Sequence, residues 1–149
     1  MQMKKVIAIA SGGGHWIQLN RLAPAFEGLQ VIWISTSHSY RDERHEKFMS
    51  VPDANVNDKI KLALVFLKCI YIAVTIRPNF VVTTGAAPGL LMLLAGRLVG
   101  AQTLWVDSIA NSEDLSSSGK FARKVAHRCV SQWPTVAKKY KIEHWGGVI

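Results

Sequence analysis

The chain has 149 residues, of which 49% are hydrophobic, and this suits one globular domain with a sizeable core. Its 18 Lys and Arg against 10 Asp and Glu leave a net charge of +8, typical of a protein with anionic partners or of a merely basic, solvated surface. No recognised nucleic-acid module accompanies that charge and the aromatic residues are scattered, so we expect no nucleic-acid partner.

The cysteines and the first residues exclude further classes of protein. Cys69 and Cys129 lie in apolar runs, without a Cys-x-x-Cys pair or His residues at zinc spacing, so we expect buried free thiols, a reducing compartment and no metal site. The apolar run after Lys5 covers only 6–10 before glycines follow, which is too short for a signal peptide.

Strand-like and helix-like segments alternate along the chain. This order predicts an α/β, Rossmann-like fold with a mostly parallel sheet flanked by helices, in a single domain over 1–149. The expected strands span 4–10, 30–35, 48–52, 80–84, 103–107 and 128–132, and the expected helices span 15–26, 58–77, 89–99, 120–127 and 134–140. The polar stretches 36–47 and 108–119 are expected to be loops, the second of them mobile.

The segment 60–76 is apolar nearly all round, which is unusual for a surface helix. A buried crossover helix is the first interpretation, and a helix that presents an apolar face to a membrane or a partner is the second. A transmembrane span is the third, but the segment falls short of about 20 apolar residues and Lys61 and Lys68 interrupt it.

A glycine run follows the first expected strand and precedes the first expected helix. Its residues Ser11, Gly12, Gly13, Gly14 and His15 offer bare backbone N–H groups beside the positive end of a helix, which suits a phosphate or diphosphate. The run matches neither the dinucleotide fingerprint nor the P-loop, so we expect no cofactor of those kinds. A tight turn without a ligand is the alternative.

A second glycine-bearing loop, 83–89, lies between an expected strand and helix. Its candidate ligand-binding residues are Thr84, Gly85, Pro88 and Gly89. Because the carboxyl ends of parallel strands share one edge of a sheet, both glycine loops are predicted to flank one diphosphate there.

Other polar residues at this edge could assist the chemistry. His15 is a candidate general base for an acceptor hydroxyl or a hydrogen-bond donor to phosphate, with a solvated helix-start residue as the alternative. Asp107 and Ser108 end another expected strand, where an Asp either orients a hydroxyl or serves as a turn or cap residue. The sequence contains no Gly-x-Ser-x-Gly elbow, paired carboxylates or metal-ligand cluster, so chemistry would depend on a positioned phosphorylated ligand or on another chain.

These motifs resemble those of the PssD-type oligosaccharide and exopolysaccharide biosynthesis proteins, bacterial relatives of the membrane-anchoring subunit of the N-glycan UDP-GlcNAc transferase. The resemblance runs in order through the whole chain, on the segments 11–15 with 18, 19 and 22, then 83–89, 105–108, 130–134, 138–140 and 146–149.

The resemblance implies the acceptor (N-terminal) domain of a GT-B, MurG-like glycosyltransferase, in which a separate PssE-type chain supplies the UDP-sugar donor site. It also implies an inverting transferase subunit that is inactive alone, a lipid-diphosphate-linked acceptor, no cofactor, and peripheral attachment to the cytoplasmic face of the plasma membrane through the apolar helix and basic residues. The family's eukaryotic relative has an N-terminal transmembrane helix that is not found here. The alternative is a non-catalytic, membrane-associated scaffold or adaptor with a vestigial glycine-loop site.

Overall fold

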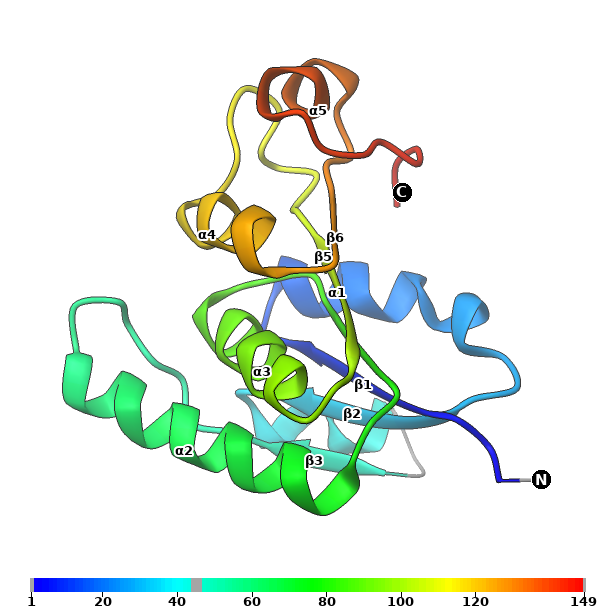
Figure 1. Ribbon diagram of the computed structural model, residues 1–149, viewed down its shortest axis with the longest axis vertical. Coiled ribbons are helices and arrows are strands. Elements are labelled where there is room, and N and C mark those ends of the chain that lie inside the picture. Colours follow the sequence, from blue (N-terminus) through cyan, green and yellow to red (C-terminus); the bar gives the residue numbers. More distant parts are fainter. Residues whose placement is uncertain (1, 44–46, 149) are drawn as a thin grey trace.

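The computed structural model, which describes residues 2–43 and 47–148, has a parallel sheet in the order β3-β2-β1-β4-β5-β6 with helices on both faces (Figure 1). The strands are β1 (Lys5–Ala10), β2 (Gln30–Ser35), β3 (Phe48–Ser50), β4 (Phe80–Thr83), β5 (Gln102–Val106) and β6 (Arg128–Val130). The helices are α1 (Gly14–Arg21), α2 (Lys59–Ile76), α3 (Ala87–Leu98), α4 (Ser117–Val125) and α5 (Pro134–Tyr140), with short 3-10 helices η1 (Ala23–Phe26) and η2 (His38–Glu43). The predicted Rossmann-like fold and all of its strands are confirmed.

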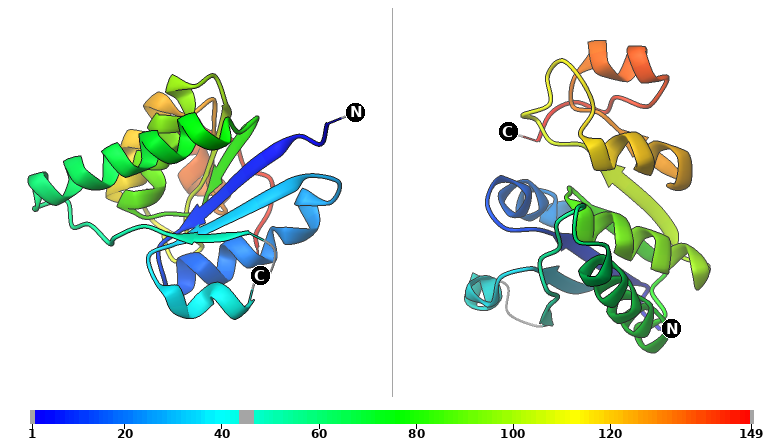
Figure 2. Two further views of the ribbon diagram at one scale, coloured as in Figure 1. Left: turned by 90° about the horizontal axis from the view of Figure 1, so that it is seen from below. Right: turned by 90° about the vertical axis from the view of Figure 1, so that its left-hand side faces the viewer.

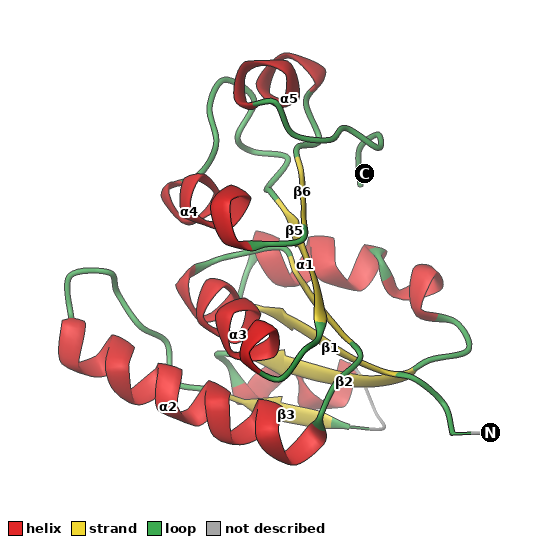
Figure 3. Cartoon of the chain, in the orientation of Figure 1, coloured by secondary structure: helices red, strands yellow, loops and turns green. Residues whose placement is uncertain are grey.

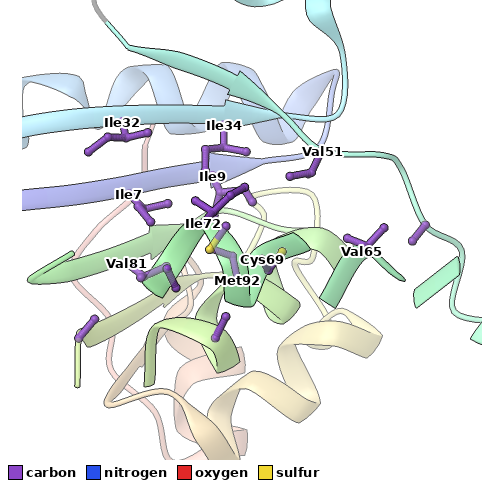
Figure 4. Packing of buried hydrophobic residues seen from close by; sticks show 14 residues of the cluster. Ile7, Ile9, Ile32, Ile34, Val51, Val65, Cys69, Ile72, Val81 and Met92 are labelled. Carbon is purple, nitrogen blue, oxygen red and sulfur yellow. The ribbon is translucent and has the colours of Figure 1, made fainter. Parts of the chain in front are cut away.

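The sheet separates two apolar layers (Figures 2 and 3). Alternate residues of β1, such as Ile7 and Ile9, face α2 and α3, and this layer is drawn in Figure 4. Their neighbours Val6 and Ala8 face α1 and η1 on the other side. Burial on both faces explains why the central strands are nearly continuous apolar runs.

Several helix boundaries differ by a few residues from the expected ones, including the start of α3 at Ala87 in place of 89, and local chemistry explains two of them. The single helix expected over 15–26 is wrong, because α1 ends at Arg21 and η1 follows with Pro24 in its first turn. The helix expected from 120 begins earlier, at Ser117, because the Ser116 hydroxyl caps it by accepting a hydrogen bond from Gly119 N at 2.9 Å.

Helix α2 is buried along one side only, so the prediction of a buried crossover helix holds for that side and fails for the other. Val65, Cys69 and Ile72 pack under the sheet. The opposite side exposes an apolar stripe at helical spacing, formed by Ile60, Leu64, Leu67, Tyr71 and Val74. Within the part of the chain that the structure describes, no helix is long and apolar enough to cross a membrane.

Both cysteines are buried and free, as predicted. Burial raises the pKa of the Cys69 thiol and of the Cys129 thiol to about 12. Neither thiol is therefore poised for nucleophilic chemistry.

Candidate functional site

The candidate site lies where the sheet reverses its winding. The chain proceeds from β1 outward to β3 and then returns to place β4 on the other side of β1. The carboxyl ends of β1 and β4 are therefore neighbours, with Ile9 paired to Thr83. In open α/β sheets a crevice at such a switch point is the usual place for a ligand.

Both predicted glycine loops lie at this switch point and are bonded to each other. The backbone N–H of Ser11 donates to the carbonyl of Gly85 at 3.0 Å. His15 Nδ1 lies 2.9 Å from the carbonyl of Thr84, and the Thr84 hydroxyl donates to the carbonyl of His15 at 2.6 Å. The predicted juxtaposition of the two loops is confirmed, whereas their binding to a diphosphate stays a prediction.

Two helices point their amino ends at the same place. The residues that precede α1 and α3, Gly13 and Ala86, provide no side-chain cap, whereas Asp58 and Ser116 cap α2 and α4. Backbone N–H groups at an uncapped helix start attract an anion, and the helix dipole adds to this. The first two helix starts therefore provide a local environment suited to a phosphate group.

Part of the second glycine loop has a packing role. Pro88 and Gly89 are buried in the first turn of α3. A Cβ atom on Gly89 would collide with the hydroxyl of Thr83, so glycine permits the close contact between helix and strand. The predicted contact of Pro88 and Gly89 with a ligand stays untested.

Tyr40, in η2, covers the first glycine loop and was not predicted as a site residue. Its hydroxyl accepts a hydrogen bond from Gly13 N at 2.9 Å, and a Cβ on Gly12 would lie 3.3 Å from that oxygen. Its ring stacks on Trp16 with 4.9 Å between centroids. Nothing local in the polar sequence around Tyr40 signals this contact, because it depends on how η2 lies against the first glycine loop and Trp16.

Asp107 is engaged inside the protein. Its buried carboxylate accepts hydrogen bonds from Trp105 Nε1 at 3.0 Å and Asn111 Nδ2 at 3.0 Å, and from the Ser116 backbone N–H at 3.1 Å and hydroxyl at 2.6 Å. These donors occupy the acceptor positions that a substrate hydroxyl would need. The geometry favours the turn-or-cap alternative for Asp107 over a role in contact with ligand.

Ser108, a predicted site residue whose contact with a ligand stays a prediction, belongs to a buried hydrogen-bond network with Gln18 and Gln132 that was not predicted. Gln18 Nε2 donates to the Ser108 hydroxyl at 3.1 Å, and Gln18 Oε1 accepts from Gln132 Nε2 at 2.6 Å. Gln132 Oε1 accepts in turn from the backbone of Val148 at 2.7 Å. The network joins α1, the loop after β5, the end of β6 and the C-terminal segment beneath the switch point.

The segment 108–119 was expected to be mobile, but hydrogen bonds hold it at both ends. Asp107 holds Asn111 and Ser116, and Asp114 accepts from Lys120 at 2.7 Å, from the Tyr140 hydroxyl and from Lys139 at 3.1 Å. The hydrogen bonds from Lys120, Tyr140 and Lys139, in that order, hold the pKa of Asp114 well below its usual value. Two carboxylates therefore organise this loop.

Two further features complete the site's surroundings. Within 2–43 and 47–148, no group of three or more His, Cys, Asp or Glu side chains is placed to hold a metal ion. An apolar cavity of about 430 Å³ lies on the sheet face and is lined by residues such as Phe26, Phe80, Leu104 and Trp145. It contains none of the predicted site residues, so we place the candidate site at the sheet edge, where the polar groups converge.

Sequence comparison relates the chain to proteins of oligosaccharide synthesis. The family described as "Oligosaccharide biosynthesis protein Alg14 like" matches residues 47–149. The matched region includes the second glycine loop and leaves out the first. The UDP-N-acetylglucosamine transferase subunit ALG14 of Eremothecium gossypii is 32% identical over 78 residues, covering 48% of this chain and 35% of that protein.

Structural comparison gives the same architecture at low identity. MurG from Acinetobacter baumannii has a TM-score of 0.73 at 16% identity, over 89% of this chain and 43% of that one. A UDP-N-acetylglucosamine 2-epimerase from Rickettsia bellii has a TM-score of 0.69 at 18% identity, over 93% of this chain and 41% of that one. The chain thus has the Rossmann-like fold of GT-B domains, and it spans less than half the length of these proteins.

Proposed function

The chain belongs to the Alg14-like family of oligosaccharide biosynthesis proteins, and from that membership we propose that it is a subunit of a bipartite, inverting UDP-sugar glycosyltransferase. In this proposal it binds a lipid-diphosphate-linked acceptor at the membrane and recruits a separate chain that carries the donor site. One fact supports a division between chains: the relative from Eremothecium gossypii is named a subunit. We assign it to the PssD type, with a PssE-type partner, in cell-surface polysaccharide or lipooligosaccharide synthesis.

The observation that carries the proposal is the convergence of α1, α3 and His15 on one switch point. The uncapped starts of both helices supply N–H donors and positive potential for a diphosphate. The contact from His15 to Thr84 places an imidazole between the two loops. A lipid diphosphate bound to these N–H groups would hold the first sugar of the acceptor beside this imidazole.

His15 acts in this proposal as the general base. The acceptor hydroxyl loses its proton to His15 Nε2 as its oxygen attacks the anomeric carbon of the UDP-sugar. The bond from that carbon to the oxygen of the β-phosphate breaks, and UDP leaves with the bonding electron pair. Attack on the face opposite the leaving group inverts the configuration at the anomeric carbon. The partner chain holds the UDP.

The exposed stripe of α2 supports peripheral contact with a membrane. Five large apolar side chains lie along one side of this helix, with Leu64 and Leu67 each 62% exposed. Lys59, Lys61 and Lys68 stand on the same helix, and Lys68 Nζ donates to the carbonyl of Ser50 at 3.0 Å. An apolar stripe with lysines beside it fits the interface of an anionic bilayer. We place the protein on the cytoplasmic face of the plasma membrane.

The test is transfer from a panel of UDP-sugars to a lipid-diphosphate acceptor, with this chain alone, the partner alone and both together. We expect activity only with both, and loss of transfer by His15→Ala without loss of folding measured by circular dichroism. His38→Ala changes an exposed histidine of η2 and serves as the control, with wild-type activity expected. Activity of this chain alone would overturn the bipartite assignment. Wild-type turnover by His15→Ala would favour the scaffold or adaptor alternative.

A further inference from the structure

The second glycine loop holds His15 through two hydrogen bonds, both made by Thr84. The carbonyl of Thr84 is 2.9 Å from His15 Nδ1, and the hydroxyl of Thr84 donates to the backbone carbonyl of His15 at 2.6 Å. One residue therefore holds both the ring and the backbone of the histidine. The loop itself is held by Thr83, whose hydroxyl accepts from Gly85 N at 3.1 Å.

The partner of Nδ1 decides which ring nitrogen carries the proton. A carbonyl oxygen can only accept a hydrogen bond, so Nδ1 must be the protonated nitrogen of the neutral ring. Nε2 then has a lone pair, and it makes no hydrogen bond within the described residues. This is the arrangement that a general base requires, because the nitrogen that takes up a proton is the one left without a partner.

Gly85 is needed because the imidazole lies against it. A Cβ atom at this position would lie 2.7 Å from His15 Nδ1 and 2.8 Å from His15 Cε1, closer than side chains pack in proteins. The φ angle of Gly85 is +119°, which also disfavours other residues. A side chain at position 85 must therefore displace the imidazole of His15 or the loop that holds it.

We propose that the second glycine loop is a positioning element for His15, in which Thr84 and Gly85 hold the imidazole as its Nδ1–H tautomer and direct Nε2 toward the acceptor hydroxyl. Thr84 and Gly85 are positioning residues in this proposal, in contrast to the prediction that they bind the diphosphate. The assignment of the tautomer stands on the contacts alone. The use of Nε2 as a base rests on the proposed function.

The first experiment uses NMR of the histidine ring nitrogens in the isolated chain. We expect His15 of the wild type to be protonated at Nδ1, and Gly85→Ala to lose this signature as the ring is displaced. Gly28→Ala is the matched control, because Gly28 also has a positive φ, +82°, but a Cβ there has nothing within 4 Å. A wild-type His15 protonated at Nε2, or a tautomer unchanged by Gly85→Ala, would overturn the proposal.

The second experiment separates positioning from binding in the two-chain transferase. Thr84→Val removes the hydroxyl that donates to His15, and Thr84→Ser keeps it. We expect Thr84→Val and Gly85→Ala to lower kcat by about 10²-fold, the scale of a lost general base, with the KM for acceptor nearly unchanged. Because Thr84→Ser keeps the hydroxyl, its kcat should be much higher than that of Thr84→Val and close to that of the wild type. A raised KM with normal kcat would instead assign the loop to acceptor binding.

The two proposals fail in different ways. If His15 has the expected tautomer and Gly85→Ala disturbs it, but His15→Ala transfers sugar normally, the proposed base is wrong and the positioning contact stands. If His15→Ala is inactive but the tautomer is not set by the loop, the base stands and the positioning role is wrong. If Gly85→Ala does not fold, Thr84→Val and Thr84→Ser still decide the outcome.

Discussion

The hydroxyl of Tyr40 accepts a hydrogen bond from the backbone N–H of Gly13, at 2.9 Å. This N–H lies in the loop that we assign to the diphosphate. The tyrosine oxygen therefore accepts a hydrogen bond that Gly13 would otherwise donate to a phosphate oxygen. Among the described residues the Tyr40 hydroxyl has no acceptor for its own proton. Its role is therefore to satisfy Gly13.

Replacing Tyr40 with Phe should free the Gly13 N–H for ligand. We expect the Kd for inorganic pyrophosphate, measured by titration calorimetry, to fall about 3- to 10-fold, because one net hydrogen bond contributes about 0.5–1.5 kcal/mol. Ser39→Ala, at the exposed neighbouring residue, should leave the Kd unchanged. A weaker affinity in Tyr40→Phe would mean that the hydroxyl binds the ligand itself.

The apolar stripe of α2 should carry the contact with membranes. In Leu64→Glu combined with Leu67→Glu, two exposed apolar side chains become charged, which opposes insertion between lipid headgroups. We expect flotation with phosphatidylglycerol-containing vesicles to fall at least about tenfold, and wild-type binding to weaken with added salt because lysines accompany the stripe. Met3→Gln is the control at an exposed apolar residue outside the stripe. If the double variant floats with vesicles as well as the wild type does, another surface of the protein must make the membrane contact.

Asp107→Asn should destabilise the protein. The Asn amide nitrogen carries N–H groups where a carboxylate oxygen now accepts, so N–H or O–H donors of Trp105, Asn111 or Ser116 would face another donor. We expect a loss of about 2–4 kcal/mol in the free energy of unfolding, measured with urea. Asp53→Asn, on an exposed residue with one local hydrogen bond, should stay near the wild type. A stable Asp107→Asn that has lost transfer would restore Asp107 as a site residue.

Asp114 should make the thermal stability of the protein depend on pH in the acidic range. Its pKa is lowered in the folded chain, so its contribution is fully present above the usual carboxyl value of about 4 and is lost as the pH falls below it. We expect the Tm of the wild type to fall more steeply than that of Asp114→Asn below about pH 4, until the two meet. High salt should reduce the difference, since the partners Lys120 and Lys139 are exposed. Parallel pH profiles would show that the cluster adds nothing to stability.

Much of the fold could be predicted because a parallel sheet buried on both faces has a strong local pattern. Apolar runs bounded by Gly, Pro and polar residues located all six strands. The exposed stripe of α2 could not be predicted in the same way, because an apolar sequence does not reveal which side lacks a covering element. Which side of α2 is exposed depends on how far the sheet and α3 extend beside it.

The residues of the candidate site also fall into two groups, those with a local sequence signal and those whose role depends on distant residues. The glycine loops and His15 have local signals, and their meeting follows from strand order. Tyr40 has no such signal, and although Gln18 and Gln132 lie in the motifs of the family resemblance, their hydrogen bonds to each other could not be predicted, because the role of an aromatic or amide side chain depends on a distant partner. The hydrogen bonds of the loop after Asp107 were missed for the same reason: Asn111 bonds to Asp107, and Asp114 bonds to Tyr140 of α5, which is 26 residues away.

The candidate site also places a condition on the order in which the chain folds. The contact from His15 to Thr84 spans 69 residues, and that from Gln18 to Gln132 spans 114. Closing such long loops is slow and unfavourable until the intervening strands have paired. A growing chain that has reached only β3 contains the first glycine loop without the residues that hold its histidine. Competence to bind and align an acceptor therefore arises only with completion of the sheet, which keeps partly made chains from presenting a working site.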